Sequence, residues 1–290
     1  MVWKKLKKTS FGTAIAFLKK RENYCVNAIS RFNSGETGNI WAAYEQNAKP
    51  GSAEIKALLL YGKRLLFPVF DFSSAEPETN FMPLPYFFSI FMKSDSLHSA
   101  QGLSSDMTIL EKTLRKKGIF SSVSYDYELR SLENEAADNA VSSYIPPGGL
   151  VVRRAAMRDA GALFPLQAGY ETEEVLPVGA AFNPAACRKV LESLIADNLI
   201  FTAELNGCLV GKININARSF NRLQIGGVYV QPEYRRQGIA LAMTAGLIRE
   251  LAPQKKGFTL FVKKANIPAR KVYDRLGFEK IGDYRISYYE

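Results

Sequence analysis

The sequence predicts an α/β (α+β) protein in which a mixed, mostly antiparallel sheet is flanked by helices, with two such domains in tandem. Segments of strand period alternate with segments of helix period, and 290 residues with 47% hydrophobic content suffice for two cores. The stretch IPPGGL at 145–150 follows acidic and small residues and resists both helix and strand. We therefore expect domains at 1–145 and 146–290.

Alternating apolar residues predict the strands of the second half, and apolar residues at helical spacing predict its helices. The expected elements are a strand at 150–155, helices at 159–171 and 183–197, a hairpin at 199–217 turning at Asn206 and Gly207, a strand at 222–230, a helix after Gly238, a strand at 257–264, a helix at 268–277 and two closing strands at 278–284 and 285–290. One strand, loop, helix, strand crossover is expected after residue 222.

The same reasoning applied to the first half gives a similar order of elements. The expected elements are a helix at 14–32, a strand at 40–46, a hairpin at 55–70, a buried strand at 86–92, a loop at 98–105, a helix at 106–118 and a strand at 122–132. The lysines near the N-terminus are interpreted as the solvated face of an amphipathic first helix, since the apolar run there is short and has no cleavage site.

Charge and rare residues limit the function. The formal net charge of +10 favours anionic partners, although nucleic acid is a weaker choice because the basic residues lack interleaved aromatics. No apolar window is long enough to span a membrane. Cys25, Cys187 and Cys208 show no metal-binding spacing and His98 is the single histidine, so we expect no metal site and a reducing, cytoplasmic location.

Phosphate-binding features gather between the strand at 222–230 and the following helix. The first N–H groups of a helix bind phosphate, and Gly238 allows close approach while Ala240 keeps the next contact small. Arg235 and Arg236 add guanidinium groups that suit phosphate oxygens. Two solvated arginines before a helix-starting glycine remain the plainer interpretation of this loop alone.

The strand before this loop contains Gly226 and Gly227 in an otherwise β-branched run. Glycines inside a strand indicate a bulge or a close approach by another backbone. A ligand with its own amide groups could pair with Val228 and Val230 as an additional strand. Pantetheine attached to a pyrophosphate is such a ligand, so one coenzyme would explain the strand and the loop together.

Two segments resemble signatures of the GNAT superfamily of N-acyltransferases. VYVQPEYRRQGIALAM is similar to V-x-P-x-x-R-x-x-G-x-[GA], and NIPARKVYDRLGF is similar to N-x-x-A-x-x-[VL]-Y-x-x-x-G-F. The matching positions are Val230, Pro232, Arg235, Gly238 and Ala240, then Asn266, Ala269, Val272, Tyr273, Gly277 and Phe278. The resemblance covers the second half and implies a GNAT fold there; the similar order of elements suggests that the first half is a degenerate GNAT-like copy without coenzyme.

The resemblance implies acetyl-CoA as the acyl donor and a primary amine, on a small molecule or a peptide, as the acceptor. It assigns coenzyme binding to Val228, Tyr229, Val230, Arg235, Arg236, Gln237, Gly238, Ile239, Ala240, Asn266 and Tyr273. The matching tyrosine commonly protonates the departing thiolate, so Tyr273 is the expected catalytic acid. Pattern alone would favour a core tyrosine at position 273 and a turn-forming role for Asn266.

The general base and the acceptor site are less defined. Many GNAT members carry a glutamate where Gln224 stands, and glutamine cannot accept a proton at useful pH. A water chain, Glu204, or an acceptor that arrives neutral are the alternatives. The oxyanion is assigned to a backbone N–H within 228–230. A non-catalytic acyl-CoA-binding regulator is the alternative function.

An acidic segment, GYETEEVLP, falls between the first two helices expected in the second domain. Such a region lines the acceptor side in GNAT folds, and Glu171, Glu173 and Glu174 could attract a cationic amine. A solvated acidic loop is the commoner explanation of such a run.

Overall fold

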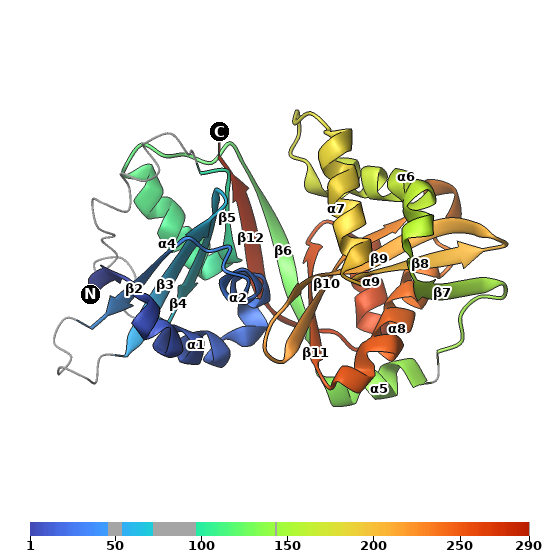
Figure 1. Ribbon diagram of the computed structural model, residues 1–290, viewed down its shortest axis with the longest axis horizontal. Coiled ribbons are helices and arrows are strands. Elements are labelled where there is room, and N and C mark those ends of the chain that lie inside the picture. The colour runs from blue at the N-terminus through green and yellow to red at the C-terminus, as the bar shows by residue number, and fades with distance from the viewer. Residues whose placement is uncertain (46–53, 72–96, 143, 290) are drawn as a thin grey trace. The chain divides into compact units, whose positions relative to one another are not determined.

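The computed structural model describes residues 1–45, 54–71, 97–142 and 144–289 (Figure 1). Two compact units form, one from Met1–Leu129 with Gly282–Glu290 and the other from Arg130–Ile281. The C-terminal segment thus belongs to the same unit as the N-terminus. The domain boundary expected near residue 145 lies inside the second unit and stays a prediction.

The first unit is built on a sheet with the strand order β1-β2-β3-β4-β5-β12-β6. Its elements are β1 (Val2–Lys5), α1 (Phe11–Lys20), α2 (Val26–Asn33), β2 (Asn39–Tyr44), β3 (Ile55–Gly62), β4 (Leu65–Phe70), β5 (Ser99–Leu103), α4 (Ser104–Arg115), most of β6 (Val123–Leu132) and most of β12 (Glu279–Tyr288). Strands β4 and β5 are parallel, whereas β1 to β4 pair antiparallel in succession and β12 pairs antiparallel with β5. Met107, Leu110 and Leu114 of α4 pack into a core with Trp41 and Leu59.

The second unit has the strand order β6-β11-β10-β9-β8-β7. Its further elements are α5 (Asn134–Ser142), β7 (Leu150–Arg154), α6 (Ala160–Tyr170) with a π-helical extension η4 (Glu171–Val175), α7 (Pro184–Ala196), β8 (Ile200–Leu205), β9 (Cys208–Arg218), β10 (Arg222–Val230), α8 (Ile239–Leu251), β11 (Gly257–Lys263) and α9 (Ile267–Arg275). Strands β7 to β10 pair antiparallel in succession, and β10 and β11 are parallel. The crossover through α8 is therefore confirmed.

Two apolar clusters hold the second unit together on opposite faces of its sheet. Ile213 and Ile215 of β9 pack with Ile248 of α8, whereas Ile200 of β8 packs with the cluster formed by α6 and α7. Because side chains alternate along a strand, the residues of β9 between its isoleucines face α6 and α7. This second face carries the polar residues described below.

Both halves of the chain share an order of elements: a strand, two helices, three strands, then a strand parallel to the last of these, a helix and a final strand. In the second half α8 precedes the parallel strand, and the corresponding residues of the first half include 72–96, which lie outside the described ranges. The parallel pairs β4–β5 and β10–β11 occupy corresponding places. The similarity between the halves expected from the sequence is confirmed at the level of fold.

Several element predictions for the first unit were wrong. Residues Val2–Lys5 form β1 instead of part of a helix, because burying Trp3 against the sheet favours an extended chain. The helix expected at 14–32 is divided into α1 and α2 by a 3₁₀ turn at Glu22–Tyr24. The expected strand at 86–92 lies outside the described residues.

Two further corrections concern strands that pair over long sequence distances. The expected loop at 98–105 contains β5, which pairs with β4 and with β12, and the two expected closing strands form the single strand β12. Small polar residues such as those of β5 carry little local strand signal, so distant pairing decides the conformation.

Among the described helices, none combines the length and apolar character needed to cross a lipid bilayer.

Candidate functional site

Strands β10 and β11 run side by side only over their first residues. Residues 222–225 pair with residues 257–260, yet the strands continue to Val230 and Lys263. Within the part of the chain that the structure describes, pairing between these two strands ends there. The backbone of β10 from Gly226 onward therefore has no ladder partner on its β11 side.

The same stretch of β10 bulges away from β9. Gly226 is paired with Asn214 and Tyr229 with Lys212, so β10 has one residue more than β9 between these pairs. Gly227 adopts a φ of +59°, which favours glycine. The bulge expected from the glycine pair is thus confirmed.

Side chains of β9 explain why positions 226 and 227 are both glycines. A Cβ on Gly226 would lie 1.9 Å from Nδ2 of Asn216, and one on Gly227 would lie 1.7 Å from Oδ1 of Asn214 and 2.7 Å from Nζ of Lys212. The close approach inferred from the sequence is therefore made by polar side chains and not by another backbone.

Lys212 is the centre of this polar group and is fully buried. Its Nζ donates to Oδ1 of Asn214 at 3.0 Å and to the carbonyl oxygen of Gly227 at 2.9 Å, and it lies 4.6 Å from the centre of the Tyr170 ring. Burial lowers the pKa of Lys212 to about 7, although Glu171 and Cys187 act in the opposite direction. Perturbed lysines of this kind are concentrated at functional sites.

Sequence reasoning did not select Lys212. A signal was present, because KININA at 212–217 alternates polar with apolar residues. Polar side chains at alternate positions of a strand in the middle of the sheet indicate a polar site on one face of that sheet. What could not be read locally is that α6 and its π-helical extension cover that face.

The loop after β10 has left-handed residues just before the N-terminus of α8. Arg236 and Gly238 have left-handed backbones, with φ of 62° and 81°, and Gly238 occupies the N-cap of α8. The first backbone N–H groups of α8, from Ile239 to Leu241, lie before the first helical hydrogen bond, in which the N–H of Ala242 donates to Gly238. Gln237 donates its side-chain amide to the carbonyl of Glu233.

Arg235 is not free in this loop. Its Nε donates to the carbonyl of Val230 at 3.0 Å, and its Nη2 donates to both carboxylate oxygens of Glu173, at 2.8 and 3.1 Å. The hydroxyl of Tyr229 donates to the same carboxylate at 2.8 Å and packs on Gly169 of α6. A ligand phosphate would have to share or replace this carboxylate.

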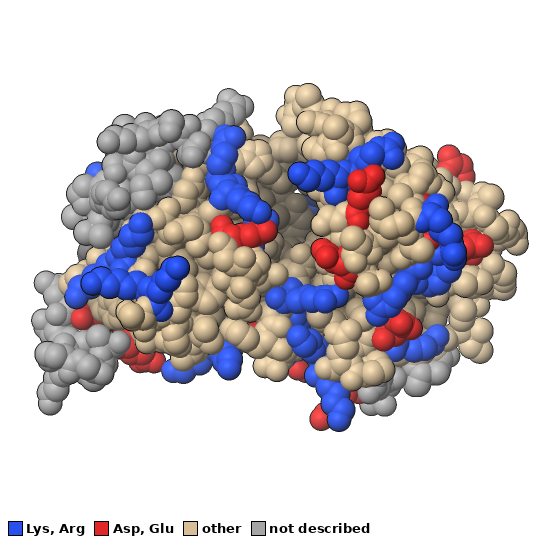
Figure 2. Space-filling model, in the orientation of Figure 1, with Lys and Arg blue, Asp and Glu red and all other residues tan. Residues whose placement is uncertain are grey.

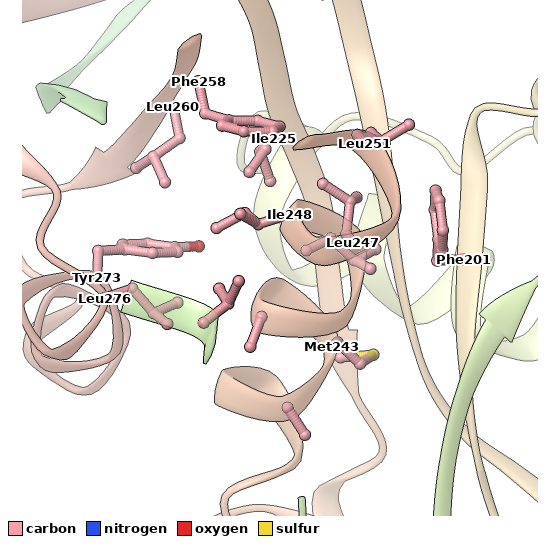
Figure 3. Close-up of a cluster of buried hydrophobic side chains, with 14 of the residues drawn as sticks. Phe201, Ile225, Met243, Leu247, Ile248, Leu251, Phe258, Leu260, Tyr273 and Leu276 are labelled. Carbon is pink, nitrogen blue, oxygen red and sulfur yellow. The ribbon is translucent and has the colours of Figure 1, made fainter. Parts of the chain in front are cut away.

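Tyr273 of α9 is buried where α8 and the sheet meet. Figure 3 shows its ring reaching from α9 toward the cluster that contains Ile248 and Leu260. The ring of Phe278 packs edge-on at 5.8 Å. Burial raises the pKa of Tyr273 far above its usual value, so the phenol stays protonated at neutral pH.

Asn266 caps α9. Its Oδ1 accepts a hydrogen bond from the N–H of Ala269 at 3.1 Å, which is the local role expected from pattern alone. Contact of Asn266 with the coenzyme stays a prediction.

The acidic segment forms the π-helical turn η4, and its three glutamates have different surroundings. Glu171 accepts from Nε2 of Gln167 at 2.8 Å and lies near Lys212, whereas Glu173 binds Arg235 and Glu174 pairs with Lys263 at 2.9 Å. All three carboxylates therefore have partners within the second unit. Attraction of a cationic acceptor stays a prediction.

Neither Gln224 nor Glu204 is an evident general base. Gln224 is buried and its Oε1 has no hydrogen-bond partner in the described structure, as is also true of Oγ1 of its neighbour Thr259 on β11. Glu204 accepts two hydrogen bonds from Arg153, which also binds Asp159. The buried unpartnered atoms mark a polar wall on the face that also carries Lys212.

A hollow of about 430 Å³ lies beside the end of β10. Its lining residues are Pro165, Tyr229, Gln231, Pro232, Glu233 and Tyr234. Since neither Lys212 nor Tyr273 lines it, the hollow is not treated as the reaction centre. Figure 2 shows lysines and arginines spread over the drawn face with acidic side chains between them, so the excess positive charge does not form one stripe there.

The parallel pair β10–β11, the bulge in β10 and the glycine-capped start of α8 lie next to one another in the second unit. Residues 170–278 match the family model described as the acetyltransferase (GNAT) family. Residues 170–278 are therefore similar to the GNAT family, and this similarity supports acyl transfer as the general activity.

Solved structures extend the likeness over the whole chain. A Drosophila protein has a TM-score of 0.64 at 12% identity, covering 99% of this chain and 98% of its own. A tandem GNAT protein from the clavulanic acid biosynthesis pathway has a TM-score of 0.59 at 10% identity, with coverage of 99% and 98%. A GNAT-family acetyltransferase from Colwellia psychrerythraea has a TM-score of 0.55 at 12% identity, with both chains fully covered.

These likenesses concern the fold, and they show that the N-terminal half is GNAT-like as well. A comparison with curated proteins gave no match.

Proposed function

We propose that the protein is an N-acetyltransferase that transfers the acetyl group of acetyl-CoA to a primary amine, by direct attack in a ternary complex. The observation that carries this proposal is the opening beside β10 that leads to the glycine-capped N-terminus of α8. An extended ligand with amides at one end and a pyrophosphate at the other is complementary to both features.

In this proposal the coenzyme follows β10 and then the loop. Val228, Tyr229 and Val230 face the pantetheine, and the pyrophosphate is held by the loop and the first turn of α8 through Arg235, Arg236, Gln237, Gly238, Ile239 and Ala240. Asn266 and Tyr273 lie toward the thioester. Arg235 exchanges part of its contact with Glu173 for phosphate oxygens.

The reaction forms a C–N bond and breaks the C–S bond of the thioester. A backbone N–H at the bulge stabilises the tetrahedral oxyanion, and the departing thiolate takes a proton from the phenol of Tyr273. The phenol of Tyr273 is protonated at neutral pH, as a proton donor has to be before the step.

The amine must lose its proton before or during the attack. Gln224 cannot accept it, and Glu204 is held by Arg153. We therefore propose that the acceptor binds neutral or loses its proton to water on the polar face of the sheet. The acceptor is an amine on a small molecule or a peptide, drawn toward the acidic turn η4.

The first test is an acetyl-CoA-dependent thiol-release screen over amines, amino acids, aminoglycosides and peptides, followed by the Tyr273→Phe variant. We expect kcat to fall about 100-fold, within the range of general acid catalysis, with little change in the Kd of coenzyme A. Tyr284→Phe is the control, since it removes a buried phenol from the first unit.

The second candidate is a protein that binds acyl-CoA without turnover, favoured by the glutamine at position 224. For such a protein the screen would release no thiol although acetyl-CoA binds, and Tyr273→Phe would leave ligand binding and its downstream effect unaltered. Failure of both binding and turnover would reject both candidates.

A further inference from the structure

Burying the amine of Lys212 carries a large desolvation cost. The lysine is fully buried, and both hydrogen bonds that its Nζ donates in the described structure go to neutral oxygens, those of Asn214 and Gly227. A buried ammonium normally needs an ionised partner to offset its lost hydration. A specific role of the amine therefore explains this buried lysine better than packing alone does.

The carbonyl of Gly227 that Lys212 binds lies in a part of β10 where no neighbouring strand fixes the orientation of the peptide bond. The bulge takes Gly227 and Val228 out of the ladder with β9, and pairing with β11 has ended two residues earlier. The direction of the peptide bond between Gly227 and Val228 is thus set by other groups, and Lys212 holds its carbonyl at 2.9 Å.

Peptide geometry then determines where the adjoining N–H points. All peptide bonds of the described structure are trans, so the carbonyl of Gly227 and the N–H of Val228 point in opposite directions. Since the carbonyl faces Nζ of Lys212, the N–H of Val228 points away from that amine. Strand β9, which carries Lys212, and the opening beside β11 lie on opposite sides of β10.

Neighbouring side chains keep the amine in place. Nδ2 of Asn214 donates to Oδ1 of Asn216 at 2.6 Å, which turns Oδ1 of Asn214 toward Lys212. The Tyr170 ring covers Nζ from α6, while Glu171 of η4 and Cys187 of α7 are the titratable groups nearby. A hydrogen bond from Nζ also polarises the peptide and strengthens its N–H as a donor.

We propose that Lys212 is a positioning residue that fixes the peptide bond between Gly227 and Val228, so that the N–H of Val228 is held ready for the thioester oxygen of acyl-CoA. This inference rests on the proposed function and names one donor and the group that orients it. Lys212 acts through the backbone and touches neither the coenzyme nor the acceptor.

The test compares Lys212→Met, which keeps length and apolar volume but removes the donor, with Thr202→Val. Thr202 is the ladder partner of Lys212 on β8, is equally buried, and donates to the carbonyl of Gly211 instead of the bulge. We expect Lys212→Met to lower kcat about 10- to 100-fold and to reduce the preference for acetyl-CoA over free coenzyme A. The Kd of coenzyme A itself and the acceptor KM should stay within about twofold, and Thr202→Val should match the wild type.

A second readout does not depend on turnover. In protein labelled with ¹⁵N-valine, the amide signal of Val228 should shift with pH with a midpoint near 7 in the wild type and in Thr202→Val, and should not do so in Lys212→Met. The inference is overturned if the Val228 signal is unaffected by Lys212→Met, or if that variant loses coenzyme A binding as strongly as acetyl-CoA binding. If the wild type binds no coenzyme at all, the proposed function fails, while the Val228 titration still decides the orientation by Lys212.

Discussion

Lys212 couples the stability of the second unit to pH. Its pKa is about 7 in the folded protein, against an ordinary value of 10.5, so the unfolded chain binds more protons between these two pH values. Above about pH 10.5 Lys212 therefore does not lower the free energy of unfolding. Between pH 10.5 and pH 7 it lowers the free energy of unfolding progressively as the pH falls, and below pH 7 this reduction has reached its full size.

Replacing Lys212 by methionine should therefore stabilise the protein most at and below pH 7. A shift of several pKa units corresponds to an advantage on the order of a few kcal/mol, since one unit is worth about 1.4 kcal/mol. The difference between variant and wild type, measured by urea unfolding from pH 6 to pH 9, should shrink as the pH rises. Thr202→Val should show an offset that does not vary with pH, and a pH-independent offset for Lys212→Met would contradict the prediction.

At the residue scale, the sequence predicts the residues whose role is local. It misses the residues whose role depends on other helices or strands that pack over them. Gly227 and Gly238 adopt left-handed backbones, so their positions could be read directly. The burial of Lys212 depends on Tyr170 and on the turn that follows it, which lie far away along the chain.

Among the elements, the π-helical turn η4 links the expected acceptor side with the phosphate loop. Its Glu173 binds Arg235 and the hydroxyl of Tyr229, and both partners in the ion pair are about two-fifths exposed. Unusual turns of this kind often occur at functional sites. A coenzyme phosphate at Arg235 would therefore meet a carboxylate that already occupies the guanidinium.

We expect Glu173→Gln to bind coenzyme A several-fold more tightly, because the substitution removes a negative charge that competes with the phosphate for Arg235. Arg235→Gln should weaken binding about tenfold and make it less dependent on salt. Both effects can be measured by isothermal titration calorimetry at several salt concentrations.

Glu233→Gln serves as the control, since it removes the same charge from the loop without touching Arg235. If it tightens binding as much as Glu173→Gln does, the effect is general electrostatics and not release of Arg235. Weaker binding by Glu173→Gln would show that the ion pair has to remain intact.

Elements formed by neighbouring residues were predicted well, and elements formed by distant pairing were not. The hairpin of β8 and β9 turns at Asn206 and Gly207, both with positive φ, as expected from the sequence. Strand β5 exists because it lies between β4 and β12, and β12 comes from the far end of the chain. No local pattern contains that information.

For the whole molecule, the main feature is that the last segment of the chain completes the first unit. Tyr284 is buried there, and Arg285 bonds to Asp126 at 2.9 Å and to Glu111 at 3.3 Å. Both tryptophans, Trp3 and Trp41, also belong to this unit, so their fluorescence reports on it selectively.

A chain that stops after Ile281 should accordingly lose the first unit before the second. We expect the tryptophan fluorescence of the truncated protein to change at a lower urea concentration, since β5 loses its antiparallel partner. Coenzyme binding, assigned to the second unit, should persist in the absence of urea and serves as the internal control. An unchanged fluorescence midpoint would show that β12 contributes little to the first unit.

The C-terminal strand also has a consequence for the timing of synthesis. Domains usually fold in the order in which the ribosome makes them, at about 5–20 residues per second. Here the first unit has most of its residues early but must wait for residues 282–288, which emerge on the order of ten seconds later. During that interval the nascent chain exposes an unpaired edge at β5, which could pair with another chain until β12 covers it.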